Sequence, residues 1–371
     1  MRVLICGGGV IGAAIAYFLS RRGVEAVVIE RTGLACAASG KSGGFLALDW
    51  CDGTPLAPLA RRSFALHDEL ARTVDDAWGY RRLTTYGGFA EAAGAAPAAR
   101  RDGDVAWLSA DVQVTRRLGS AQTTAQVDPG AFTAALMRAA EAHGATLRRG
   151  QVTGLLRGAQ AARVDGVMVD DAPVPGDAVV IALGPWSILA TQWLTLPAVF
   201  GLKGHSLVFE TGAQVPAQAL FLDLQEADGT ALAPELFPRA DGTTYVCAIS
   251  SEAPLPLDPA AVAPDAGAIE RLEAICGRLS PVLGQAPIRA RQACYRPVTR
   301  DGLPLIGRVP GIANAYVATG HSVWGILNAP ATGEAMADLI TTGAAVAVDL
   351  RPFDPARLRP FDPARLRLGE R

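Results

Sequence analysis

Residues 2–12 read Arg-Val-Leu-Ile-Cys-Gly-Gly-Gly-Val-Ile-Gly, and this stretch decides the fold of the chain. The apolar run at 2–6 predicts a buried strand, and residues 10–22 carry apolar side chains at helical spacing. A second apolar run at 24–30 follows and ends in an acidic residue. The order strand, glycine turn, helix, strand predicts a β-α-β unit.

The glycines of this turn have the GxGxxG spacing of dinucleotide-binding sites. We expect Gly7 to make the tight turn, Gly9 to let a pyrophosphate approach the backbone at the helix N-terminus, and Gly12 to allow close packing of the helix. Glu30, at the end of the second strand, is expected to accept hydrogen bonds from ribose hydroxyls. The bare motif is weak evidence, but strand, helix and acidic residue in register favour a dinucleotide site over a purely structural turn.

The composition indicates a large core and small-molecule partners. Of 371 residues, 50% are hydrophobic and 19% charged, enough for more than one typical domain. A net charge of −2 without a Lys/Arg cluster argues against nucleic acid or an anionic membrane as partner. Six dispersed cysteines lack metal-ligand spacing and favour a reducing compartment. We expect a cytoplasmic protein without a membrane span, since a strand beginning at residue 2 leaves no room for a targeting segment.

A second glycine-rich segment, Ala-Ala-Ser-Gly-Lys-Ser-Gly-Gly at 37–44, follows the second strand. Its hydroxyls and amides can contact a pyrophosphate and reach toward a flavin ring, whereas a nicotinamide enzyme has little use for it. The segment therefore favours FAD over NAD. Its candidate cofactor contacts are Ser39, Lys41, Ser42, Gly43 and Gly44.

The rest of the chain alternates helical and strand patterns. Helices are predicted at 58–74, 128–143, 266–279 and 331–341, and strands at 177–183, 207–210, 245–250, 292–297 and 316–319.

These patterns predict an α/β fold in which a Rossmann-type FAD-binding domain carries an inserted α+β substrate domain built on an antiparallel sheet. An Ala-rich, irregular stretch at 89–104 is read as an excursion into the second domain. The tail repeats Arg-Pro-Phe-Asp-Pro-Ala-Arg-Leu in tandem, and its prolines exclude a helix interior, so a partly ordered tail is expected. The FAD-binding domain is assigned to 1–85, 122–200 and 288–350, the substrate domain to 86–121 and 201–287, and the tail to 351–371.

Four segments carry a family resemblance: 177–187 (DAVVIALGPWS), 237–242 (FPRADG), 295–307 (YRPVTRDGLPLIG) and 318–326 (ATGHSVWGI). With them the chain resembles, over nearly its whole length, the D-amino-acid oxidase, glycine oxidase and sarcosine oxidase family. The sequence of residues 320–333 (GHSVWGILNAPATG) is similar to that of a subgroup of mitochondrial and plant FAD oxidoreductases.

The resemblance implies an FAD-dependent oxidoreductase acting on a small amino acid or N-substituted amino acid. Such an enzyme takes a hydride from the carbon beside the nitrogen to flavin N5 and gives an imine, and O2 or another acceptor reoxidises the flavin. The segment 318–326 is expected to wrap the pyrimidine edge of the flavin, and Gly333 to begin the last helix. The remaining cofactor contacts that we expect are Val10, Ile11, Arg31, Val152, Gly184, Trp186, Gly307, Gly320, Ser322, Trp324, Gly325 and Ile326.

Arg296 and His321 are the strongest catalytic candidates. By resemblance, Arg296 holds the substrate carboxylate, for which a bidentate guanidinium is suited. The alternative is a structural arginine paired with Asp301 or Asp241. His321, in a glycine turn, is an odd choice for a core residue and is expected to contact the flavin or its substrate.

Lys203 and His205 are weaker active-site candidates, placed by resemblance in the segment that leads into the substrate domain. Lys203 is one of only two lysines; near the flavin its compact ammonium could promote oxygen reactivity or bind a distal carboxylate. The other two histidines, His67 and His143, are predicted to lie on ordinary helix surface.

Cys294 lies seven residues before Asp301, where sarcosine oxidases carry a covalently attached flavin. Because the sequence after Cys294 departs from the sarcosine oxidase pattern, we expect a buried thiol near the flavin without a thioether bond.

Two rival functions stay open. An FAD monooxygenase would also need an NAD(P)H site, and the chain has no second GxGxxG. The second rival is an assembly or binding protein in which FAD has a structural role and turnover is low. Arg296 and His321 argue for catalysis, but their presence in the sequence does not by itself demonstrate activity.

Overall fold

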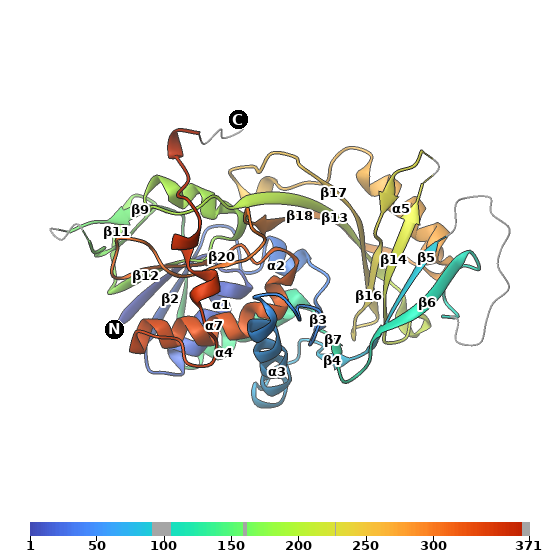
Figure 1. Cartoon of the computed structure of the whole chain (residues 1–371), viewed down its shortest axis with the longest axis horizontal. Coiled ribbons are helices and arrows are strands. Elements are labelled where there is room, and N and C mark those ends of the chain that lie inside the picture. Colours follow the sequence, from blue (N-terminus) through green and yellow to red (C-terminus); the bar gives the residue numbers. More distant parts are fainter. Residues whose placement is uncertain (91–104, 159–161, 227, 366–371) are drawn as a thin grey trace.

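The computed structural model describes residues 1–90, 105–158, 162–226 and 228–365. Most of the Ala-rich stretch and the last residues of the tail lie outside the described residues. Two sheets dominate the described chain, one in each half of the molecule (Figure 1).

The first sheet has the order β19-β20-β12-β1-β2-β8, and β19 is an antiparallel edge on an otherwise parallel sheet. Its central strands are buried on both faces, which explains their continuous apolar runs. Helices α1, α4 and α7 pack together beneath this sheet (Figure 1). The bounds are β1 Arg2–Cys6, β2 Glu25–Glu30, β8 Thr146–Arg149, β12 Ala178–Ile181, β19 Leu305–Arg308, β20 Ala315–Thr319, α1 Val10–Ser20, α4 Pro129–Glu141 and α7 Gly325–Thr342.

The second sheet has eight strands in the order β18-β13-β17-β16-β14-β5-β6, with β15 paired to β14. It is antiparallel except for the β14–β5 pair, and α5 packs against it. The bounds are β5 Thr84–Ala90, β6 Val112–Gly119, β13 Phe200–Glu210, β14 Gln218–Gln225, β15 Ala231–Leu232, β16 Glu235–Pro238, β17 Thr243–Ser251, β18 Ile288–Val298 and α5 Ala268–Leu279.

Shorter elements complete the described chain. Two three-stranded sheets have the orders β11-β10-β9 and β3-β7-β4. None of the helices in the described chain is both long and apolar enough to cross a membrane. The remaining bounds are β3 Phe45–Ala47, β4 Arg81–Arg82, β7 Thr124–Gln126, β9 Val152–Leu156, β10 Gly166–Val169, β11 Ala172–Pro175, α2 Ala38–Lys41, α3 Ala57–Thr73 and α6 Pro281–Gln285.

The predicted fold class is confirmed, and two expectations differ from the structure. Residues 288–298, placed in the FAD-binding domain from sequence, form β18 and pair with β13 of the antiparallel sheet. The last helix was expected to begin at Gly333, but α7 begins at Gly325 and carries Pro330 in its interior.

A buried histidine satisfies a backbone carbonyl that the proline inside α7 leaves without its helical hydrogen bond. Pro330 has no N–H for the carbonyl of Ile326, and His67 Nε2 donates to that oxygen at 3.0 Å instead. The freed backbone N–H of Ala331 donates to Ser63 Oγ at 3.0 Å. The prediction that His67 lies on helix surface is therefore wrong, whereas His143 is exposed as predicted.

The two copies of the tail repeat lie in different surroundings. In the first copy Phe353 is fully buried in the core beside the parallel sheet, and Arg357 forms an ion pair with Asp301. In the second copy Phe361 is half-buried. The two identical octapeptides thus differ in the burial of their phenylalanine, because the first copy lies over the parallel sheet (Figure 1).

His67 gives the first prediction, a pH dependence of stability. Its Nδ1 is buried without a partner in the described chain, and burial lowers its pKa from 6.5 to about 4. Below pH 6.5 the unfolded chain binds a proton that the folded chain refuses, so the stability supported by neutral His67 falls between pH 6.5 and about 4, by up to about 3 kcal/mol. Gln at this position keeps a donor but does not titrate. We expect thermal unfolding to show a smaller loss on acidification for His67→Gln than for the wild type.

The matched control is His143→Gln, because His143 is exposed at the end of α4. Its melting temperature should follow the wild-type pH profile. Parallel profiles for His67→Gln and the wild type would show that His67 carries no acid-linked stability.

Candidate functional site

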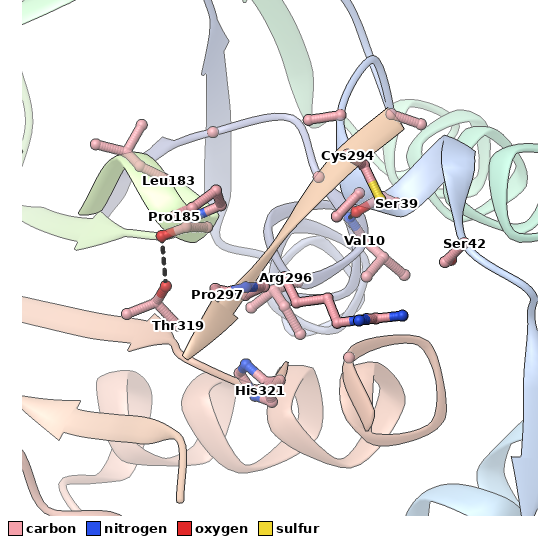
Figure 2. Close-up of a pocket in the computed structure, with 18 of the residues that line it drawn as sticks. Val10, Ser39, Ser42, Leu183, Pro185, Cys294, Arg296, Pro297, Thr319 and His321 are labelled. Carbon is pink, nitrogen blue, oxygen red and sulfur yellow. Dashed lines mark hydrogen bonds between the residues drawn. The ribbon is translucent and has the colours of Figure 1, made fainter. Parts of the chain in front are cut away.

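A cavity of about 430 Å³ lies between the two sheets. Its lining joins the ends of the parallel strands and the N-terminus of α1 to the inner face of the antiparallel sheet. Figure 2 shows the side chains that meet there from β18, from the α1 turn and from the segment after β20.

The glycine turn after β1 is closely packed at Gly7 and Gly12 and more open at Gly9, where the approach of a pyrophosphate stays a prediction. A Cβ on Gly7 would lie 2.3 Å from Ala182 O, and one on Gly12 would lie 2.0 Å from Gly7 O, so both positions need glycine for packing. A Cβ on Gly9 would meet only Ser39 Oγ, at 3.1 Å. Gly7 and Gly9 line the cavity, whereas Gly12 lies behind them and packs α1 against the turn.

The N-terminus of α1 is suited to a phosphate group. The first turn carries no acidic residue, and the backbone N–H of Val10 points to Ser39 Oγ at 2.9 Å. Ser42 Oγ lines the cavity and is buried without a hydrogen-bond partner in the described chain. A helix N-terminus, a bare glycine and an unpartnered hydroxyl together fit the pyrophosphate and flavin of FAD.

Glu30 lies at the end of β2 on the cavity wall. One carboxylate oxygen accepts from Gly8 N at 2.7 Å, and the other accepts from Thr32 N at 2.7 Å. These bonds hold the carboxylate at the strand end, where the predicted contact to ribose hydroxyls stays a prediction.

The cavity brings together most of the predicted cofactor contacts. Lys41 and Gly307 are exceptions: Lys41 ends α2 without lining the cavity, and a Cβ on Gly307 would lie 3.1 Å from Pro355 in the tail. The predicted residues that line it are Gly7, Gly9, Val10, Ile11, Glu30, Arg31, Ser39, Ser42, Gly43, Gly44, Val152, Gly184, Trp186, Cys294, Gly320, His321, Ser322, Trp324, Gly325 and Ile326.

Lys203 and His205 do not line the cavity, and their prediction as active-site groups is not supported by their position. Side chains alternate along a strand, and in β13 the residue that faces the cavity is Gly204. Lys203 Nζ pairs with Asp265 Oδ1 at 2.5 Å, and His205 Nε2 accepts from Asp265 N at 3.1 Å. Both side chains therefore hold the segment before α5 against the opposite face of the sheet.

Arg296 faces the cavity from β18, as does Cys294, with buried Tyr295 between them on the other face. In Figure 2 the guanidinium extends away from His321, toward the side of the cavity where Ser42 lies. Its Nη1 donates to Ser250 Oγ at 2.9 Å, and within the described chain it forms no ion pair.

The ion pair of Arg296 with Asp301 or Asp241, which the structural alternative expected, is not formed, because both acidic residues have other partners. Asp301 pairs with Arg357 at 2.8 Å, and Asp241 pairs with Arg289 at 2.9 Å. The Arg296 guanidinium is thus left facing the cavity.

His321 is a buried, neutral imidazole at the cavity wall. It follows Gly320, whose φ of +78° suits glycine, and its Nε2 lies 3.1 Å from Thr332 Oγ1. Burial lowers its pKa from 6.5 to about 3, so it supplies a hydrogen-bonding group and no positive charge.

Sequence reasoning missed one wall of the cavity. Glu235 and Phe237 of β16 and Tyr245 and Cys247 of β17 line it from the antiparallel sheet. Their spacing of two was the available signal, because residues two apart share one face of a strand. Only pairing of the strands shows which face meets the dinucleotide turn.

A parallel sheet with a glycine turn at a helix N-terminus, facing an antiparallel sheet across one cavity, is the architecture of a class of flavin-dependent oxidoreductases. The chain belongs to the DAO family of FAD dependent oxidoreductases, whose model matches residues 2–339. Its cofactor is FAD, and it is an oxidoreductase.

Sequence relatives match over most of their own length. A Schizosaccharomyces pombe protein described as an oxidoreductase is 29% identical over 383 residues, covering 95% of this chain and 97% of the relative. A glycine oxidase of Geobacillus kaustophilus is 28% identical over 392 residues, covering 96% of each. The solved structure of glycine oxidase from Geobacillus kaustophilus has a TM-score of 0.76 at 24% identity and covers 96% of this chain and 98% of that one.

Gly9 gives a prediction about cofactor binding. In Gly9→Val the new side chain would occupy the approach to the helix N-terminus, and its Cβ would lie 3.1 Å from Ser39 Oγ. We expect colourless protein that retains a cooperative thermal transition, measured by visible absorbance and unfolding of the apoprotein. Undiminished FAD content in Gly9→Val would show that the pyrophosphate does not approach this backbone.

Cys294 gives a prediction about covalent attachment. Its side chain lies beside Ser39 and Val10 (Figure 2), and burial raises the pKa of its thiol, against the nearby positive charges of Arg296 and Lys41. A thiol kept protonated is a poor nucleophile, so we expect acid precipitation to release the flavin into the supernatant. Yellow colour that stays with the pellet and disappears in Cys294→Ala would contradict this expectation.

Proposed function

We propose that this chain oxidises the C–N bond of a small amino acid or N-substituted amino acid, with Arg296 as the group that holds the substrate carboxylate. The observation that carries the proposal is a guanidinium that lines the cavity and has no ionic partner in the described chain. A partly buried cation of this kind is stabilised by a ligand anion.

The surroundings of Arg296 favour a planar carboxylate as its ligand. Gly204 of β13, whose partner across the β13–β18 pair is Cys294, has no side chain, and a Cβ there would lie 3.3 Å from the Arg296 guanidinium. Ser250 Oγ engages Nη1 and leaves the other guanidinium nitrogens for a ligand. A bidentate contact fixes both the position and the orientation of a carboxylate, as a reaction at the adjacent carbon requires.

Bound FAD supplies the hydride acceptor for the carbon beside the nitrogen. The chain contributes the carboxylate contact of Arg296 and the largely apolar side chains that line the cavity. The neutral His321, with Nε2 near Thr332 Oγ1, offers one hydrogen bond to a bound group without adding charge. The product is an imine that water hydrolyses, and O2 or another acceptor takes the electrons.

Sequence similarity supports this choice of substrate. The glycine oxidase relative is named for an amino acid, and it matches this chain from end to end. In a protein that held FAD only for assembly, a cation prepared for a ligand anion would have no evident use. Reduction of the bound flavin by an amino acid separates the two functions.

Replacement of Arg296 tests the proposal directly. Arg296→Ala removes a charge-assisted, bidentate contact of about 1.5–3 kcal/mol, which corresponds to roughly a 10- to 150-fold loss in the rate of anaerobic flavin reduction per unit substrate concentration. Arg296→Lys should recover part of the rate, because an ammonium keeps the charge and loses the fork. FAD content should stay near the wild-type value in both variants.

Arg289→Ala is the matched control, since Arg289 lies on the same strand but is exposed outside the cavity. It should leave flavin reduction unchanged. If Arg296→Ala empties the FAD site while the remaining holoenzyme reduces normally, the arginine is structural and the proposal fails.

A further inference from the structure

Side chains from three neighbouring strands form one wall of the cavity. Phe221 of β14, Glu235 of β16 and Cys247 of β17 are direct cross-strand partners. Phe237 and Tyr245 are partners in the adjacent position on the same face. All five line the cavity, because residues two apart on a strand face the same way.

Glu235 is a carboxylate in this wall without a cationic partner. Its recorded hydrogen bond comes from Cys247 Sγ at 3.5 Å, a weak donor, and no basic nitrogen of the described residues lies within ion-pair distance. Burial raises its pKa, and the positive charge of Arg296 acts in the opposite direction. A carboxylate that is half-buried at the cavity wall is costly unless a cation compensates it, so a cationic ligand fits here.

Aromatic rings lie next to Glu235 on this wall of the cavity. Phe45 and Trp50, from the dinucleotide-binding half, meet Phe221 with centroid distances of 5.0 and 4.7 Å. Phe221 lies 5.3 Å from Phe237, which stacks on Tyr245 at 6.1 Å. Aromatic faces attract ammonium groups, and alkylated ammonium groups most readily lose their water to such a surface.

The charges of the cavity fall into two pairs. Among the described residues that line it, Glu30 and Arg31 lie at the β2 end, and Glu235 and Arg296 lie on the antiparallel sheet. Glu235 and Arg296 influence each other electrostatically but form no ion pair. The substrate wall therefore presents one fixed positive and one fixed negative group, which matches a zwitterion.

We propose that Glu235 and the aromatic side chains of Phe45, Trp50, Phe221, Phe237 and Tyr245 form an ammonium site, and that the substrate is an N-alkylated amino acid. This inference rests on the proposed function, because Arg296 holds the carboxylate of the same molecule. The nitrogen must lose its proton before its lone pair can form the C=N bond, and the Glu235 carboxylate is the adjacent group that accepts that proton.

Two inert probes of equal shape test the ammonium site in the FAD-loaded protein. Glycine betaine carries a carboxylate and a trimethylated ammonium, and 3,3-dimethylbutanoate has a carbon atom in place of the nitrogen. Neither can be oxidised at a C–N bond by hydride loss, so binding is measured by calorimetry and by perturbation of the flavin spectrum. We expect betaine to bind the wild type about tenfold more tightly or better.

Glu235→Gln should weaken the binding of betaine by about tenfold and leave the binding of 3,3-dimethylbutanoate almost unchanged, since the substitution removes the charge of the side chain and keeps its shape. Glu210→Gln, an exposed position on β13 of the same sheet, should alter neither probe. In anaerobic reduction, the wild type should prefer sarcosine over glycine, and Glu235→Gln should lose this preference.

The failures of the two proposals are distinguishable. Equal binding of both probes to the wild type, no binding of betaine, or a preference for glycine would each overturn the ammonium site. If 3,3-dimethylbutanoate then still binds and Arg296→Ala weakens it, the carboxylate contact of the proposed function stands. If no amino acid reduces the flavin at all, the proposed function itself falls.

Discussion

The contact between the start of α1 and the turn after β1 is the constraint on which the rest of the site depends. A side chain on Gly12 would collide with the carbonyl oxygen of Gly7, so only glycine lets the helix begin this close to the strand. On the other side of α1, a Cβ on Gly333 of α7 would lie 2.7 Å from the backbone of Ala14. Two close approaches thus fix α1 between the turn and α7, with its N-terminus directed at the cavity.

The paired strands β13 and β18 carry the other half of the site. They run side by side over most of their length and lie at the edge of the antiparallel sheet (Figure 1). Side chains alternate between the two faces of these strands. Gly204, Cys294 and Arg296 therefore face the cavity, while Lys203 and Tyr295 face away. A shift of one residue in this pairing would exchange the two sets, so the β13–β18 register decides whether Arg296 faces the cavity.

Few charged side chains line this cavity among the described residues, and their positions determine how a charged ligand would be oriented. His321 stays neutral because burial lowers its pKa to about 3, and buried Tyr245 and Cys247 have raised pKa values for the same reason. Arg296 and Glu235 are then the charged groups of the substrate wall in the described chain. A ligand that carries both signs of charge is held in one orientation, which reaction at a single carbon requires.

The sequence by itself determined the fold class and the choice of FAD, because the glycine spacing at 7, 9 and 12, the glycine-rich segment at 37–44 and the alternation of strand and helix patterns can be read along the chain. Through a resemblance that extends over nearly the whole chain, it also named Arg296 as the candidate for the substrate carboxylate, and that role stays a prediction. Only the tertiary structure decided that Lys203 and His205 face away from the cavity, that His67 replaces the hydrogen bond lost at Pro330, and that Glu235 joins the substrate wall. Each of these depends on which face of an element meets a partner 60 or more residues away in the chain. Periodicity within one element defines its two faces, but it does not determine which of them the partner covers.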